Sequence, residues 1–181
     1  MAISRRHFML RSSLAAVGTT ALPALAHVAS AAPPVGAALM PVRQWQLIES
    51  VAEAIVPGAA QAGIRQFLQK QLAQPSHQVL LMVRYLALPL TPVEFYRQLG
   101  AQLQQQADLL SHEREEFTRS HALTLADAMA EDAVDNWQGL PASLFHFVLR
   151  SDGCDVVYGT PAGSRLLGVE YMPHIRPAEV L

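Results

Sequence analysis

The chain has 181 residues, the length of one ordinary domain, and its composition of 51% apolar and 15% charged residues excludes intrinsic disorder over most of that length. A single cysteine excludes an internal disulfide framework and a thiolate metal cluster made by this chain alone, and no apolar run reaches the 18 residues of a membrane span. From residue 32 onward ten basic residues stand against fifteen acidic ones, a net charge of −5 that argues against binding to nucleic acid or to an anionic lipid surface.

Residues 1–31 have the three parts of a cleavable export signal. A basic segment without acidic residues, residues 1–11, precedes a weakly apolar and alanine-rich stretch at residues 12–28. Ala29 and Ala31 then form the pattern of small residues that precedes a cleavage site. The sequence therefore predicts an exported, periplasmic protein from which residues 1–31 are removed.

The basic segment contains Ser-Arg-Arg-His-Phe-Met, which is similar to the twin-arginine export pattern. Arg5 and Arg6 are the arginine pair, and Phe8 is the apolar residue that follows after one spacer. The alternatives are an ordinary secretory signal with a chance arginine pair and an amphipathic helix. The twin-arginine translocase carries folded proteins, often after a cofactor has been loaded, whereas this chain has no cofactor motif. The mismatch suggests that the cofactor belongs to a partner.

After a linker rich in alanine, proline and glycine at residues 32–40, residues 41–153 are predicted to form an all-α domain. Apolar residues recur there every three or four positions, and no run of useful length alternates as a strand would. The expected fold is therefore an irregular bundle of about five to six helices. The expected helices cover residues 41–56, 64–72, 79–88, 91–110, 111–128 and 141–149.

Local signals set three of these expectations. Residues 79–88 are apolar almost all round, which predicts the central, buried helix. Thr91 and Glu94 have the spacing of a capping box, so a helix is expected to begin there. Ser111 is expected to cap the following helix, because acidic residues come shortly after it.

Residues 154–181 are predicted to form an extended tail, because glycine and proline become frequent from Gly153 onward. Within this tail, residues 155–158 could form a short strand and residues 160–163 a turn. The apolar side chains of such a tail must either pack over the helices or lie on another protein.

The sequence lacks the common motifs of catalysis and cofactor binding. There is no Gly-x-Gly-x-x-Gly, phosphate loop, Gly-x-Ser-x-Gly or Cys-x-x-Cys-His, and His112-Glu113 lacks the second histidine of a zinc helix. His121 and His146 lie among apolar residues and are expected to be hydrogen-bonded in the core, whereas His174 in the tail could meet a partner or a substrate. We expect no catalytic residue, no metal ligand and no cofactor-binding residue in this chain.

Acidic and amide side chains are expected to be solvated rather than catalytic. The glutamines within residues 102–106 are expected to form a solvated helix face. The carboxylates expected on the surface are Asp132, Asp135, Asp152 and Asp155.

Cys154, as the single cysteine of an exported chain, has three interpretations. It is buried and inert, it is a reactive thiol, or it forms one half of an intersubunit disulfide. The neighbouring carboxylate of Asp155 disfavours a reactive thiolate.

Residues 154–163 and 167–175 resemble the C-terminus of the gluconate 2-dehydrogenase subunit 3 family, and residues 54–58 and 62–64 resemble its early motif. Members of this family are small subunits of periplasmic flavin-dependent alcohol and sugar dehydrogenases. The resemblance implies that a large partner subunit holds FAD and the substrate, and that this chain supports the folding and twin-arginine export of that partner. It also implies that a haem-carrying cytochrome subunit passes electrons to the membrane in many such complexes. Membrane association is therefore expected only through partners.

The tail is expected to contact the partner. Tyr158 and Tyr171 are natural anchors, because tyrosine is favoured where one end of a side chain is buried and the other is wet. Met172 and His174 lie in the same stretch, and Cys154 is the candidate for an intersubunit bond. Two other hypotheses remain open: a stand-alone periplasmic helical binding protein or chaperone with a ligand in its bundle, and a small hydrolase that uses a histidine.

Overall fold

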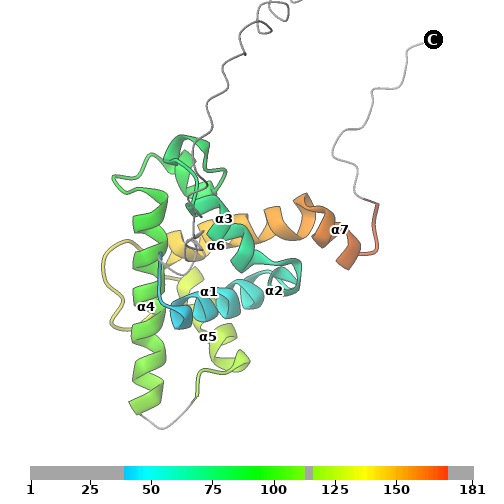
Figure 1. Ribbon diagram of the computed structural model, residues 1–181. Coiled ribbons are helices and arrows are strands. Elements are labelled where there is room, and N and C mark those ends of the chain that lie inside the picture. Colours follow the sequence, from blue (N-terminus) through cyan, green and yellow to red (C-terminus); the bar gives the residue numbers. More distant parts are fainter. Residues whose placement is uncertain (1–38, 113–115, 171–181) are drawn as a thin grey trace, which may run out of the picture. The chain divides into compact units, whose positions relative to one another are not determined.

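The structure is a computed structural model that describes residues 39–112 and 116–170 (Figure 1). All regular secondary structure within these ranges is helical, which confirms the predicted all-α fold. The α-helices are α1 (Val42–Ile55), α2 (Ala59–Ala62), α3 (Ile64–Leu72), α4 (Pro92–His112), α5 (Arg119–Ala130), α6 (Ala142–Gly159) and α7 (Pro161–Leu166), and the 3-10 helices are η2 (Ser76–Gln78) and η3 (Met82–Leu86). The predicted signal and partner-contact residues outside the described ranges are Arg5, Arg6, Phe8, Ala29, Ala31, Tyr171, Met172 and His174.

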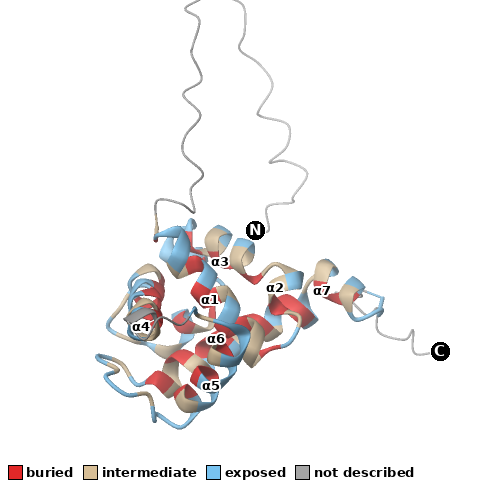
Figure 2. Ribbon diagram, turned by 90° about the horizontal axis from the view of Figure 1, so that it is seen from below, coloured by how far each residue is buried: buried red, intermediate tan, exposed pale blue. Residues whose placement is uncertain are grey.

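The first helix, α1, supplies the centre of the core and contacts α4, α5 and α6. Trp45, Ile48 and Val51 recur every three residues and are at most 1% exposed, so their side of the helix is buried (Figure 2). The helix begins directly after Pro41, whose fixed φ suits a helix start, and it ends two residues before Pro57. Both ends agree with the prediction to within one residue.

A tight connection leads from α1 through α2 into α3. The carboxylate of Glu53 accepts hydrogen bonds from the backbone N–H groups of Gly58 (3.0 Å) and Ala60 (2.9 Å), which fixes the start of α2. Gly63 has a φ of 93° and ends α2 while starting α3, a left-handed conformation that favours glycine. The buried stripe of α3 is formed, as predicted, by Ile64, Leu68 and Leu72.

The segment 79–88 is not the central buried helix that its composition predicts. The backbone is extended at Val79 and Leu81, and only η3 forms a short helical turn. Val79, Leu81 and Val83 are buried, whereas Leu80 between them is 59% exposed. Because nearly every position in the segment is apolar, a helical period and a two-residue period fit it equally well, and composition cannot separate them.

The fourth helix, α4, begins at the predicted capping box. The Glu94 carboxylate accepts a hydrogen bond from the Thr91 backbone N–H (2.7 Å), and Thr91 Oγ1 accepts one from the Glu94 backbone N–H (3.2 Å). The helix continues to His112, so Ser111 lies in its last turn. The expectation that Ser111 caps the next helix is therefore wrong.

The next helix, α5, takes its cap from Thr118 instead. Thr118 Oγ1 accepts a hydrogen bond from the His121 backbone N–H (3.4 Å), and His121 Nδ1 accepts one from the Thr118 backbone N–H (3.1 Å). Histidine thus occupies the position that Glu or Gln holds in the usual capping box. The familiar sequence signature is absent for this reason.

The sixth helix, α6, continues to Gly159, past the boundary predicted at residue 153. Residues 155–158 are helical rather than a strand, and residues 160–163 begin α7 rather than form an isolated turn. Gly153 lies inside this helix and does not end it. A glycine is needed there because a Cβ atom would lie 3.1 Å from the side chain of Val56. The glycine allows α6 to approach the end of α1 closely. The prediction of an irregular tail from residue 154 onward is wrong for residues 154–166, which belong to α6, α7 and the residue between them, and residues 171–181 lie outside the described residues.

The loop between α5 and α6 supplies the cap of α6. Asp132 Oδ1 accepts a hydrogen bond from the backbone N–H of Ser143, and Asp132 Oδ2 accepts one from its hydroxyl group, both at 2.7 Å. These hydrogen bonds hold the pKa of Asp132 below its usual value. This predicted surface carboxylate is exposed, as expected, and serves as a helix cap.

Candidate functional site

One side of α6 exposes apolar side chains to solvent. Phe147 and Tyr158 are 44% and 65% exposed, although the opposite face of the helix lies in the core. Ser151 and Cys154 lie between them at spacings of four, three and four residues, so the four side chains share one side of the helix. We call Phe147, Ser151, Cys154 and Tyr158 the α6 ridge. Helices pack against partner helices along stripes with this spacing.

The turn after α7 exposes further apolar side chains. Leu167 and Val169 are 45% and 56% exposed. They come directly before Tyr171 and Met172, two of the predicted partner contacts. A single exposed apolar residue needs no explanation, but a series along one helix and its continuation is typical of an interaction surface.

Cys154 is a free, half-buried thiol in the middle of the α6 ridge. Its side chain packs against the hydrophobic core without being fully buried, so the inert interpretation stays open beside the other two. A partner that packed along the ridge would cover the sulfur from its solvent side. An intersubunit disulfide stays a prediction, as one of the three interpretations of this residue.

Asp152 is fully buried, contrary to the prediction that it lies on a solvated surface. Its Oδ1 accepts a hydrogen bond from the backbone N–H of Met82 (2.8 Å), and its Oδ2 accepts one from the hydroxyl of Tyr96. Burial raises the pKa of Asp152 to about 6, although both hydrogen bonds oppose the shift. A sequence signal for this position existed, because Asp152 is in phase with the buried Phe145 and Val148.

The glutamines of α4 hold the loop between α5 and α6 rather than form only a solvated face. The side-chain amide of Gln106 donates to the backbone carbonyl of Asp135 (3.0 Å). The side-chain oxygen of Gln102 accepts from the backbone N–H of Gln138 (3.2 Å). The loop therefore stays beside the second half of α4.

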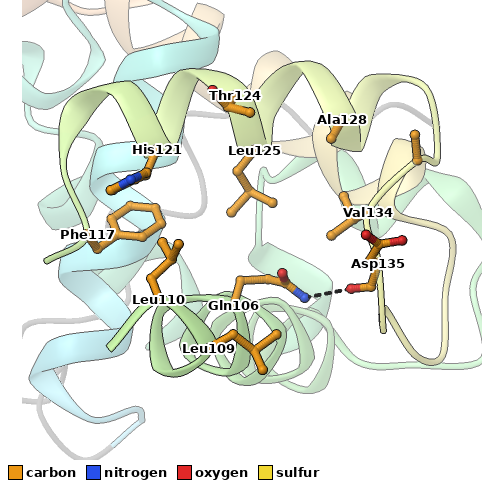
Figure 3. A pocket seen from close by; sticks show the side chains of 11 residues that line it. Gln106, Leu109, Leu110, Phe117, His121, Thr124, Leu125, Ala128, Val134 and Asp135 are labelled. Atoms are coloured by element: carbon orange, nitrogen blue, oxygen red, sulfur yellow. Dashed lines mark hydrogen bonds between the residues drawn. The ribbon is translucent and has the colours of Figure 1, made fainter. Parts of the chain in front are cut away.

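A pocket of about 310 Å³ lies between α4, α5 and this loop (Figure 3). Apolar side chains such as Leu110, Leu125 and Val134 line it, and Gln106 lies at its edge, bonded to the loop. Its volume is at the lower end of the range for small-molecule sites. The lining residues are Gln106, Leu109, Leu110, Phe117, His121, Thr124, Leu125, Ala128, Ala133, Val134 and Asp135.

The two histidines predicted for the core are partly buried. His121 lies at one end of the pocket, where its ring forms part of the α5 cap. Burial lowers the pKa of His146, and the positive charge of Arg150 adds to this effect. The ring Nδ1 of His121 also lies 3.0 Å from Thr118 Oγ1, a contact that belongs to the same cap.

Within residues 39–112 and 116–170, no three His, Cys, Asp or Glu side chains lie close enough together to hold a metal ion. The same residues contain no helix that is both long and apolar enough to cross a bilayer. Comparisons of the chain with family models, with curated proteins and with solved structures gave no match. The functional assignment therefore depends on the residues of the chain itself, and chiefly on the α6 ridge.

Proposed function

We propose that this chain is the non-catalytic small subunit of a periplasmic flavin-dependent dehydrogenase of sugars or alcohols. Its role is to support the folding and twin-arginine export of the large subunit, which carries FAD and the substrate site. The observation that carries the proposal is the α6 ridge, which exposes the two aromatic side chains of Phe147 and Tyr158 on either side of the half-buried thiol of Cys154. The sequence resemblance and the arginine pair Arg5 and Arg6 point to the same role.

The ridge has the chemistry of an interface with a large protein. Phe147 and Tyr158 are aromatic residues of the kind that anchor interfaces. Exported proteins reside in an oxidising compartment, so Cys154 can form a disulfide with a cysteine of the partner. A haem-carrying subunit would contact the large subunit and would pass electrons to the membrane.

Affinity purification of the tagged chain from the cells that express it tests the proposal. The tagged wild-type chain should copurify with a yellow protein that contains FAD. Phe147→Gln and Tyr158→Gln should each reduce the recovered flavin at least about tenfold, because each removes an apolar anchor. Leu123→Gln, at an equally exposed apolar position on α5, is the matched control and should retain the flavin.

A non-reducing gel of the same preparation tests the disulfide. A heavy band that reductant removes, and that Cys154→Ser abolishes, is the expected result. The proposal would be overturned if the wild-type chain, purified alone, contained stoichiometric flavin. It would also be overturned if both ridge variants recovered as much flavin as the wild type.

A stand-alone helical binding protein is the second candidate, favoured by the pocket between α4 and α5. Titration with a fluorescent apolar probe, 1-anilinonaphthalene-8-sulfonate, tests it. Stoichiometric binding that Ala128→Phe abolishes by filling the pocket would support this candidate. If Ala128→Phe binds the probe as well as the wild type does, the binding-protein candidate is ruled out.

A further inference from the structure

Asp152 joins three elements that are far apart in the sequence. The residue belongs to α6, its Oδ1 is bonded to the backbone of η3 through Met82, and its Oδ2 is bonded to α4 through Tyr96. The other buried polar side chains in the described part of the chain are Ser164 and the aromatic residues Tyr96 and Trp45. A fully buried carboxylate without a cation is costly, so its position requires an explanation.

The segment attached to Asp152, residues 79–88, has little regular structure to hold it. Arg84 Nη1 donates to the carbonyl of Val79 (2.9 Å), which is a contact within the segment itself. The backbone N–H of Leu80 donates to the Gln71 side chain on α3 (2.9 Å). The buried side chains of Val79, Leu81 and Val83 hold the segment in the core, and the hydrogen bond from Met82 to Asp152 joins its η3 turn to α6.

We propose that Asp152 is a proton-controlled latch for the segment 79–88, which opens more readily when this carboxyl is ionised than when it carries a proton. In the closed state the carboxylate is removed from water, and opening the segment would let water reach it. The protonated carboxyl has no charge to solvate. It can donate to Tyr96 Oη while its other oxygen still accepts from Met82, so the closed state suits it better.

The charged and titratable groups around Asp152 do not compensate for the burial of an ionised carboxylate. On α4, burial raises the pKa of Tyr96, and the negative charge of Asp152 raises it further, so the phenol stays neutral. On α6 itself, the carboxylate of Asp155 disfavours ionisation of Asp152. On η3, the guanidinium of Arg84 is bonded to the Val79 carbonyl. No described cation forms an ion pair with Asp152 to offset its burial.

The direction of the pH effect follows from linkage. The pKa of Asp152 is raised from 3.8 to about 6 in the closed state, so this state binds the proton more tightly than a state in which the carboxyl meets water. Opening should therefore become rarer as the pH falls through about 6. From these two values, opening is expected to be about tenfold rarer at pH 5 than at pH 7.5.

Hydrogen exchange of the mature chain tests the latch. Peptides that cover residues 79–88 are followed at both pH values, with rates corrected for intrinsic exchange, and peptides from α1 report global opening. In the wild type, the corrected exchange rate of residues 79–88 should be about tenfold lower at pH 5 than at pH 7.5, after any change in the α1 peptides has been subtracted. Asp152→Asn, a neutral isostere that can accept from Met82 and donate to Tyr96, should abolish the difference.

Tyr96→Phe provides a second variant in case Asp152→Asn does not fold. It removes a hydrogen bond that favours the ionised carboxyl, so the pH difference should be at least as large as in the wild type and should extend to higher pH. Equal opening of the wild-type segment at both pH values would overturn the proposal. A pH difference that survives unchanged in Asp152→Asn, or that disappears in Tyr96→Phe, would do the same. None of these outcomes depends on the partner in the proposed function.

Discussion

At the scale of single residues, Gly163 is the position least able to accept a side chain. It lies where α7 crosses the end of α6, and a Cβ atom there would lie 2.1 Å from the backbone carbonyl oxygen of Val157. Gly163→Ala should therefore displace α7 and reduce the free energy of unfolding by about 1–3 kcal/mol. Urea denaturation followed by circular dichroism measures the change.

Gly159 provides the matched control for this substitution. It is the last residue of α6, has no heavy atom within 4 Å of a built Cβ atom, and does not have a left-handed backbone. Gly159→Ala should be neutral or stabilise the protein by up to about 1 kcal/mol. Equal destabilisation by both alanines would mean that loss of glycine flexibility, rather than the contact with Val157, causes the effect.

Asp152 shows how a single residue can escape sequence analysis. Its phase with Phe145 and Val148 placed it on the buried side of a helix, but the prediction ended that helix ahead of it. Gly153 suggested the early end, because glycine both terminates helices and permits close packing between them. Only the position of Val56 against Gly153 decides between these roles, and that contact joins residues far apart in the sequence.

At the scale of elements, the continuation of α6 makes the effect of truncation predictable. A chain that stops after Gly153 loses Val156 and Val157, each 1% exposed in the core. Burial of two such side chains contributes about 3–6 kcal/mol, which is comparable with the total stability of a small domain. This truncated chain should lack a cooperative thermal transition in circular dichroism.

A second truncation, after Glu170, separates the core from the tail. It keeps α6 and α7 complete and removes only residues 171–181. Its thermal transition should stay close to that of the full mature chain, while Tyr171 and Met172 are no longer available to a partner. A cooperative transition in the chain that ends at Gly153 would contradict the structural role assigned to the end of α6.

The elements differ in how far the sequence predicted them. Helix α3 was predicted well because its apolar stripe is narrow, and α1 and α4 were predicted well because their first turns also follow a proline or a capping box. The start of α5 was missed because His121 replaces the usual acidic residue of the box. The prediction of a helix over residues 79–88 was wrong because the segment is apolar at nearly every position and so shows no periodicity. Contacts of η3 with α4 and α6 decide its conformation instead.

The candidate site was predicted in part. Cys154 and Tyr158 were singled out from the sequence, and both lie on the α6 ridge. Phe147 was missed, although its spacing to Cys154 and Tyr158 is helical, because an extended tail was expected from residue 154 onward. A ridge on a helix could be predicted only once the helix itself was known to continue.

At the scale of the whole molecule, the export signal proposed for residues 1–31 makes a prediction about location. Replacement of Arg5 and Arg6 together by lysine should trap the precursor in the cytoplasm, because guanidinium and ammonium groups are not equivalent at a recognition site. Cell fractionation with an antibody to the chain measures the distribution. Arg11→Lys, outside the pair, is the control and should be exported normally.

Normal accumulation of the double lysine variant in the periplasm would contradict the twin-arginine assignment. Export through the ordinary secretory route would then remain. The proposed small-subunit role would survive that outcome only if the partner carried its own signal. Fractionation of the partner in the same cells distinguishes these cases.

The central position of α1 also has a consequence for synthesis on the ribosome. Its apolar face contacts α4, α5 and α6, so its partners emerge only after most of the chain has been translated. At ordinary elongation rates the interval between α1 and the end of α6 is on the order of ten seconds. Throughout that time Trp45, Ile48 and Val51 lack the side chains that bury them in the folded protein. They lie shortly after the export signal proposed for residues 1–31. The nascent chain therefore exposes the most apolar face of α1 before the rest of the core exists, and this face is prone to aggregate until α6 has been made.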